Sequence, residues 1–324
     1  MILAGDIGGT NTRLAIFEDG QERVKVAEGR FLSQNYPSLL PIIQTFLKQF
    51  SNFIPTRAAF GIAGAVRDGH CHATNLPWIV DAKELERSLH ISPVSLLNDL
   101  EANAWGLRAL KPEELCLLHA GESKAVGNAA LIAAGTGLGE AGLYWDGRQH
   151  HPFATEGGHT DFGPRNDLEI DLLRYLRKIY DHVSYERIIS GPGLYHIYQF
   201  LVVSGLESAA KEVQSEMTQK DPSIVISDWS RNNRDAACAR AVDWFISLYG
   251  AEAGNLALKI MSLGGLYVGG KIATIFYEII KKGGFVRSFL DKGRFSPLLS
   301  TIPVYMVLNE DAPLLGAVEF ARTH

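Results

Sequence analysis

The 324-residue sequence contains little cysteine and no long apolar segment. Its three cysteines, Cys71, Cys116 and Cys238, lie far apart and form no CxxC pair, which argues against disulfides or a structural zinc site and favours a reducing compartment. No uninterrupted run of about 18 apolar residues could span a bilayer, and no basic segment precedes the first apolar run as in a signal peptide. We therefore expect a soluble, cytoplasmic protein.

A strong charge of either sign and a phosphate-binding lysine motif are also missing. The net charge is -5 and the basic residues are scattered, which argues against broad nucleic-acid binding. No GxxxxGK[ST] segment occurs. Residues 137–142 fit GxGxxG, but a strand pattern follows where a dinucleotide site needs a helix. Residues 161–163 spell DFG without the catalytic loop of a protein kinase, so both matches are set aside.

What is present is a mixed α/β pattern. The length suits about two domains, and 46% hydrophobic with 21% charged residues is typical of a globular protein. Apolar strands alternate with segments of helical periodicity, which indicates α/β layers. The expected strands are 2–7, 12–18, 23–28, 58–64, 94–99 and 302–308, and the expected helices are 38–50, 100–110, 167–180, 235–261 and 312–322, the last with Asp311 as its N-cap.

One segment is repeated. IGGTNTRLAIFEDG, from Ile7, matches AGTGLGEAGLYWDG, from Ala134, at a constant offset. This alignment places Gly8 on Gly135, Ile16 on Leu143, Phe17 on Tyr144 and Asp19-Gly20 on Asp146-Gly147. Each copy reads as strand, Gly/Thr turn, strand and DG hairpin. The repetition suggests a duplicated fold, although glycine-rich segments also recur by chance.

The first glycine turn, in GDIGGTNTR, has the composition of a phosphate cradle. Successive backbone N–H groups without side chains can grip phosphate oxygens, and Thr10, Asn11 and, in the second copy, Thr136 would add donors. Asp6 could then hold a Mg²⁺ through its waters. The simpler alternative is a tight turn that Asp6 caps. Two copies and an adjacent acid favour phosphate binding.

These turns resemble the phosphate hairpins of the actin, hexokinase and sugar-kinase superfamily, and the resemblance to its bacterial glucokinase branch covers nearly the whole chain. LLNDLEANAWGL (96–107) and EGGHTDFGP (156–164) are the specific motifs, since glycine turns alone indicate only the superfamily. The cysteine-rich zinc motif of the related sugar kinases and repressors is absent. Because the first hairpin begins almost at Met1, we expect no helix-turn-helix domain of the kind that the repressors carry. The further matching segments are 131–143, 185–198, 264–273 and 291–307.

The resemblance implies a duplicated actin/hexokinase-like (ribonuclease H-like) α/β fold with two lobes and a central cleft. It implies a small domain of residues 1–110 plus 301–324, a large domain of residues 111–300, and a homodimer. The implied activity is ATP- and Mg²⁺-dependent phosphorylation of glucose at its 6-hydroxyl, giving glucose 6-phosphate for glycolysis. The alternatives are a kinase for another hexose and a non-catalytic sugar or nucleotide sensor. A sensor could lose Asp6 or Asp99, and this chain keeps both.

The resemblance also assigns the site. Asp99 would be the general base and would contact the sugar, although from its position alone it reads as a helix N-cap. Glu186, in a first helical turn, would by itself be a surface acid. The sugar ligands would be Asn98, Asp99, Glu156, His159 and Glu186. The nucleotide and its phosphates would meet Gly5, Asp6, Ile7, Gly8, Gly9, Thr10, Asn11, Gly135, Thr136, Gly137, Gly264 and Gly265, with Gly269-Gly270 also bordering the nucleotide, and Asp6 would hold the Mg²⁺.

Overall fold

The computed structural model describes residues 1–20, 22–122, 124–231 and 234–324. These residues form two compact units. The first unit comprises Met1–Glu114, His151–Ala154 and Asn309–His324, and the second comprises Leu115–His150 and Thr155–Leu308. None of the described helices combines the length and apolar composition needed to cross a bilayer.

The first unit is built on a five-stranded sheet in the order β3-β2-β1-β4-β8. The first three strands are antiparallel, whereas β1, β4 and β8 run parallel. A small sheet, β5-β6-β7, precedes α2. The strands are β1 (Ile2–Ile7), β2 (Asn11–Phe17), β3 (Lys25–Leu32), β4 (Arg57–Ile62), β5 (Val66–Arg67), β6 (His70–His72), β7 (Ile79–Asp81) and β8 (Val94–Asn98).

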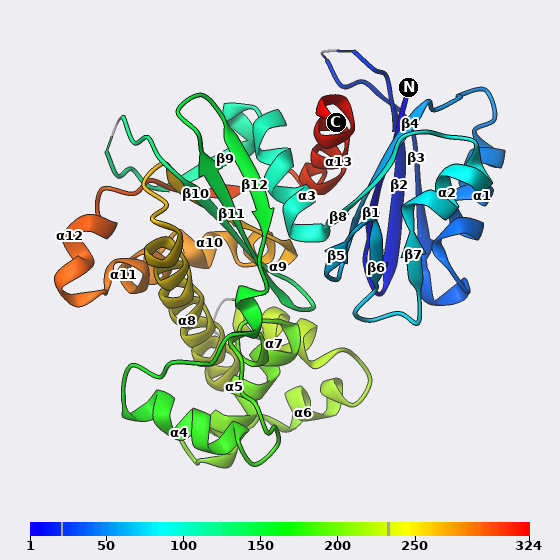
Figure 1. The fold of residues 1–324 in the computed structure, drawn as a ribbon. Coiled ribbons are helices and arrows are strands. Elements are labelled where there is room, and N and C mark those ends of the chain that lie inside the picture. The colour runs from blue at the N-terminus through cyan, green and yellow to red at the C-terminus, as the bar shows by residue number, and fades with distance from the viewer. Residues whose placement is uncertain (21, 123, 232–233) are drawn as a thin grey trace. The chain divides into compact units, whose positions relative to one another are not determined.

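Helices cover both faces of this sheet, α3 and α13 on one side and α1 and α2 on the other (Figure 1). The alternation of side chains along β1 explains this, because Ile2 and Ala4 join one core and Leu3 and Ile7 the other. All four are buried. The helices are α1 (Leu39–Gln49), α2 (Ala82–Leu89), α3 (Asp99–Gly106) and α13 (Ala312–Thr323).

In the second unit the strands are hydrogen-bonded in the order β11-β10-β13-β14-β9. The long helix α8 packs against β10, α5, α7 and α11 and is buried along most of its length (Figure 1). The strands are β9 (Leu115–His119), β10 (Ala129–Ala134), β11 (Leu138–Trp145), β12 (His150–Ala154, nearly all of it grouped with the first unit), β13 (Gly265–Gly269) and β14 (Val304–Val307). The helices are α4 (Asp167–Leu176), α5 (Gly191–Val203), α6 (Lys211–Met217), α7 (Pro222–Ser230), α8 (Ala236–Ile260), α9 (Lys271–Ile275), α10 (Tyr277–Ile280), α11 (Gly284–Leu290) and α12 (Ser296–Leu299).

The two sheets repeat one topology. β1 and β10 each pair antiparallel with the next strand and parallel with a later one, β4 or β13. The turns differ in length, since Ile7 pairs with Thr12 whereas Ala134 pairs with Leu138. The constant offset is therefore wrong beyond the turn. Leu143, paired with Ala129, takes the place of Phe17, and the exposed Tyr144 points to the opposite face.

Near the carboxyl terminus, one expectation needs correction and another is met in position alone. Residues 301–308 belong to the second unit, because β14 pairs with β13 and β9 there. Asp311 occupies the N-cap position of α13, as expected, but its carboxylate accepts no hydrogen bond from the helix N–H groups. It instead binds Arg13 and, at 2.7 Å, the Lys25 Nζ. The carboxylate is therefore used in ion pairs with two strand residues and not in a capping hydrogen bond.

Candidate active site

In the first unit, the glycine turn and Asp99 lie at the same edge of the sheet. The register pairs Ile7 with Ile62 and Ile62 with Asn98, so the parallel strands β1, β4 and β8 end side by side. The segments that leave those ends are the glycine turn from Gly8 and the start of α3 at Asp99. Ligands of open α/β sheets bind outside the carboxyl ends of parallel strands. The sequence motifs therefore converge on the expected edge.

A buried serine, Ser33, holds the first glycine turn through hydrogen bonds. Ser33 Oγ donates to the Gly8 carbonyl at 2.8 Å, and the Ser33 N–H donates to the Thr10 carbonyl at 3.0 Å. Since its one hydroxyl hydrogen is used, Ser33 Oγ accepts from Thr12 Oγ1, 3.0 Å away. Both side chains are fully buried. Ser33 lies far from the turn in sequence, and no local pattern pointed to it.

Gly9 in this turn and Gly5 in β1 before it have no room for a side chain. A Cβ on Gly9 would lie 2.6 Å from the Cβ of Asn75, and neither Gly8 nor Gly9 has a positive φ. A Cβ on Gly5 would lie 2.5 Å from Phe60 Cδ1. Gly5 and Ile7 are buried within the sheet, between β2 and β4, so the structure exposes neither of them to a ligand. Thr10 is exposed, as a phosphate donor should be.

Asp6 faces an arginine across the hairpin. It is directly paired with Arg13 in the strand register, and burial raises the pKa of Asp6 while Arg13 and Arg30 oppose that rise. Arg13 also donates to Asp311, to Glu28 Oε1 at 3.0 Å and to the Glu310 carbonyl at 3.0 Å. The arginine that ends GDIGGTNTR thus orders the surroundings of Asp6, a role that the sequence analysis did not assign.

Asp99 is the first residue of α3, and its neighbour provides the cap. Asn98 Oδ1 accepts from the N–H groups of Leu100 at 3.0 Å and Glu101 at 3.3 Å, and Asn98 Nδ2 donates to the Gly64 carbonyl at 3.2 Å. Interpreting Asp99 as the N-cap is therefore wrong. Asp99 Oδ1 accepts from the Leu100 N–H at 2.9 Å. The amide oxygen of Asn98 accepts from the helix and one Nδ2 hydrogen is donated to Gly64, so only the second Nδ2 hydrogen is left for another acceptor.

The glycine turn of the second unit is tied to Glu186. Within it, the Gly135 N–H donates to the Gly137 carbonyl at 2.8 Å. The Leu138 N–H donates to Glu186 Oε2 at 3.1 Å, and a Cβ on Gly137 would lie 2.5 Å from that oxygen. Gly137 is thus needed so that Glu186 can reach the turn. Thr136 is exposed at its tip.

Three of the expected sugar ligands gather beside this turn. His159 Nε2 lies 4.0 Å from Glu156 Oε2, and His159 Nδ1 lies 4.0 Å from Glu186 Oε1. Gly158 is buried, and a Cβ there would lie 2.0 Å from the Leu138 carbonyl oxygen, so the loop rests against β11. About half of the His159 and Glu156 side chains is exposed, at 52% and 59%, against 26% for Glu186. The polar atoms can therefore meet a ligand.

The register separates the two glycine pairs expected at the nucleotide. Gly265 pairs with Ala129 at the amino end of β13, so Gly264 and Gly265 lie at the end opposite the 135–137 turn. Gly269 pairs with Ala133 beside that turn. Gly270 follows with φ +84, and a Cβ there would lie 2.4 Å from the Ala134 carbonyl oxygen. Of the two pairs, Gly269-Gly270 is the one at the site edge.

A buried tyrosine fixes this edge. Tyr249, in α8, accepts from the Ala134 N–H at 3.1 Å, and its hydroxyl lies 3.3 Å from the carbonyl oxygens of Ile132 and Gly269. Burial raises the pKa of Tyr249, so the hydroxyl keeps its hydrogen. The tyrosine therefore binds both strands that lead to the glycine turns.

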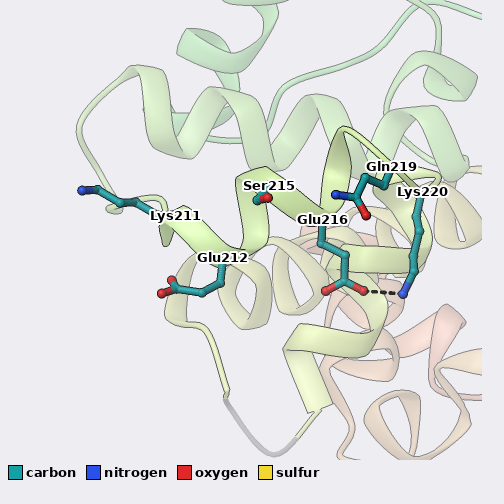
Figure 2. A pocket seen from close by; sticks show the side chains of 6 residues that line it. All are labelled: Lys211, Glu212, Ser215, Glu216, Gln219 and Lys220. Atoms are coloured by element: carbon teal, nitrogen blue, oxygen red, sulfur yellow. Dashed lines mark hydrogen bonds and ion pairs between the residues drawn. The ribbon is translucent and has the colours of Figure 1, made fainter.

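Two other features fall outside this arrangement. The hollow in Figure 2 lies on α6 and the turn after it, and none of the expected site residues lines it. Among the residues that the structure describes, no group of three or more His, Cys, Asp or Glu side chains is placed to hold a metal. Asp6 thus belongs to no such group, which suits an ion held mainly by phosphates and water.

Comparisons with known proteins agree with this geometry. The glucokinase family model matches residues 3–324. The chain belongs to the glucokinase family. The glucokinase of Nostoc sp. is 40% identical, with 98% of this chain and 97% of the relative covered, and that of Nostoc punctiforme is 38% identical with the same coverage. The chain is accordingly an enzyme of the glucokinase class.

Solved structures support the fold. A glucokinase from an Antarctic psychrotroph matches with a TM-score of 0.84 and 30% identity over 100% of this chain and 99% of that one. A glucokinase of the ROK family from Streptomyces griseus, solved with glucose and AMPPNP, matches with a TM-score of 0.68 and 20% identity over 100% and 99% of the chains. The expected actin/hexokinase-like α/β fold is confirmed.

Proposed function

We propose that this member of the glucokinase family transfers the γ-phosphoryl group of ATP to the 6-hydroxyl of glucose, with Asp99 as general base. The observation that carries the proposal is the start of α3. Asn98 caps the helix and holds the backbone, while Asp99 lies at the sheet edge beside the braced glycine turn. A carboxylate at a helix N-terminus is stabilised in its ionised form.

In the proposed reaction Asp99 accepts the proton of the 6-hydroxyl as that oxygen attacks the γ-phosphorus. The new P–O bond forms while the bond to the β-phosphate oxygen breaks, and ADP leaves. Catalysis by positioning and charge stabilisation is sufficient for such a transfer. The fixed geometry of Asp99 supplies the positioning.

Glucose would be held by Glu156, His159, Glu186, Asp99 and the free hydrogen of Asn98. A hexose presents hydroxyls that both donate and accept, and carboxylates, an imidazole and an amide can pair with them in a fixed pattern. A sugar that lacks one hydroxyl would leave a site group unpaired, which costs affinity. The proximity of Glu156 and Glu186 to His159 supports this assignment.

The phosphates would meet the glycine turns at residues 8–11 and 135–137, and the nucleotide would border Gly269-Gly270. A bound Mg²⁺ would neutralise charge that develops on the phosphates. Asp6 fits such an ion, because a nearby cation would favour the ionised carboxylate against the burial that raises its pKa. We further propose that the enzyme acts in the cytoplasm, supplies glycolysis and forms a homodimer; the three free cysteines suit a reducing compartment.

Replacing Asp6 by asparagine is expected to raise the Mg-ATP requirement by about tenfold or more, because the charge-assisted contact contributes about 1.5–3 kcal/mol. The glucose KM should change little. Initial rates at varied Mg²⁺ and ATP test this, with Asp19→Asn, in the hairpin turn of the same unit, as the control. An unchanged metal dependence in the Asp6 variant would remove Asp6 from the nucleotide site.

Replacing Glu156 by glutamine should raise the glucose KM by about tenfold or more, since a charged hydrogen-bond acceptor is lost. The kcat at saturating glucose should fall less. The exposed Glu212 of α6 provides a matched control, Glu212→Gln, at which no change is expected. A wild-type KM in the Glu156 variant would mean that the loop does not bind the sugar.

The direct test is a coupled assay for sugar phosphate with Mg-ATP and a panel of hexoses. Strong preference for glucose would support the proposal. Turnover of mannose or an N-acetylated hexose in its place would keep the mechanism and change the substrate. A folded protein that binds ATP and glucose but phosphorylates no hexose would indicate the sensor alternative.

A further inference from the structure

Two carboxyl groups are buried together beneath the loop that carries Glu156 and His159. Glu140 in β11 is 1% exposed and Glu252 in α8 is 0% exposed. Burial, and next the nearby charge of Glu252, raises the pKa of Glu140. Two buried carboxylates beside one another repel, and a proton on one of them removes the repulsion and supplies a donor for the other.

The loop that carries Glu156 and His159, here called the sugar loop, lies directly against Glu140. A Cβ on Gly157, the first residue of the 3₁₀ turn at Gly157–His159, would lie 1.9 Å from Glu140 Oε2. The hydroxyl of Thr155 donates to the Glu140 carbonyl at 2.9 Å and accepts from the Gly157 N–H at 3.3 Å. Backbone and side chain of Glu140 thus contact the segment that leads into Glu156 and His159.

The two carboxyls differ in their surrounding partners. Glu252 Oε1 lies 3.3 Å from Lys259 Nζ, and Glu252 Oε2 accepts from Asn255 Nδ2 at 2.7 Å. Glu140 Oε1, by contrast, is buried and has no hydrogen-bond partner among the described residues. The ammonium of Lys259 and the amide of Asn255 both contact Glu252, where they stabilise a negative charge. Glu140 has no such partner at Oε1, so the proton is better placed on Glu140.

Other titratable groups face this pair. From α8 these are Lys259 and Tyr249, from the 3₁₀ turn at Tyr185–Arg187 the phenol of Tyr185, and after α11 the ammonium of Lys292, with Arg165 near it. Burial lowers the pKa of Lys292 to about 8 and raises that of Tyr185. Burial, and next the charge of Glu252, raises the pKa of Glu140 to about 8. Glu140 and Lys292 are thus the groups that can change charge just above neutral pH.

We infer that Glu140 is a positioning residue of the sugar loop, acting as a neutral carboxylic acid that donates a hydrogen bond to Glu252. When Glu140 loses its proton, two negative charges repel beneath Gly157 and the loop shifts, which moves Glu156 and His159. The inference rests on the proposed binding of glucose by that loop. The glucose KM should then rise above about pH 8, approaching about tenfold per pH unit, while kcat changes less.

The test is Glu140→Gln, because glutamine keeps the size of the acid, donates to Glu252 and cannot ionise. It should retain the neutral-pH glucose KM within about twofold and abolish the alkaline rise, as seen in KM profiles and in glucose titrations by tryptophan fluorescence. Lys292→Gln and Glu212→Gln should keep the rise. A rise that persists in Glu140→Gln, disappears in Lys292→Gln or is absent from the wild type would overturn the inference.

A second readout needs neither sugar nor nucleotide. The infrared difference spectrum of wild type minus Glu140→Gln at neutral pH should contain the C=O stretching band of a protonated carboxyl. A spectrum without that band would disprove the neutral acid, whatever the enzyme phosphorylates. If the band is present but no hexose is turned over, the proposed function is wrong, whereas the protonated state of Glu140 is supported.

Stability gives a third, independent readout. The native state binds the Glu140 proton more tightly than the unfolded chain, so between about pH 4.5 and pH 8 the unfolding free energy falls as pH rises. Glu140→Gln should lack this part of the slope. The unfolding free energy of the variant minus that of the wild type, measured by urea unfolding, should therefore increase across that range. Lys292, whose pKa burial lowers to about 8, changes the slope only above about that pH. Parallel slopes in the two proteins would contradict the buried proton.

Discussion

Replacing Asp99 by asparagine is expected to lower kcat by roughly 10²–10⁴-fold, the usual contribution of a positioned general base. Asparagine keeps the shape of the side chain and can still contact the sugar, but it cannot accept the proton of the 6-hydroxyl. Glucose affinity should therefore change much less than turnover. The coupled assay gives kcat, and tryptophan fluorescence gives the glucose dissociation constant.

The matched control for Asp99→Asn is Glu101→Gln in the same first turn of α3. Both variants remove one negative charge from this helix terminus, so a general electrostatic effect would appear equally in both. Near-normal turnover in the Asp99 variant would exclude it as the base. Loss of glucose binding in parallel with turnover would make it a sugar ligand alone.

Local patterns predicted much of the fold and part of the site. The strand expected at 2–7 is found at those residues, and the long helix expected at 235–261 occupies Ala236–Ile260. Glu156, His159 and Glu186 come together as the family motifs indicate. Strand and helix periodicity are local properties, and motif residues keep their spacing, so these features can be read from one sequence.

Features that depend on register or on distant partners could not be predicted. A turn shorter by one residue shifted the match of Tyr144, and only the pairing of β13 with β10 distinguishes Gly264-Gly265 from Gly269-Gly270. Asn98 and Asp99 are both good cap residues, so the composition does not say which one caps α3. Ser33, Tyr249 and Glu140 act on segments far from them in the chain, and no spacing rule connects them.

The position of Asp99 also depends on a crossing of two helices in the first unit. A Cβ on Gly316 of α13 would lie 1.6 Å from the Ala102 carbonyl oxygen, and one on Gly106 would lie 2.0 Å from the Ala312 carbonyl oxygen. The backbones of α3 and α13 are therefore in direct contact. Ala102 lies one turn after Asp99, so a displacement of this crossing moves the base.

Gly316→Ala is expected to lower the free energy of unfolding by about 3 kcal/mol, the upper part of the usual cost of overpacking, because the methyl group meets backbone that cannot rotate away. Urea unfolding measures this loss, and Gly20→Ala is the control, since a Cβ there meets nothing within 4 Å. The folded fraction of Gly316→Ala should also lose kcat, because α3 can accommodate the methyl group only by moving Asp99 with it. Equal midpoints for the two variants would show that the crossing yields without cost, and then neither the stability of this unit nor the placement of the base depends on Gly316.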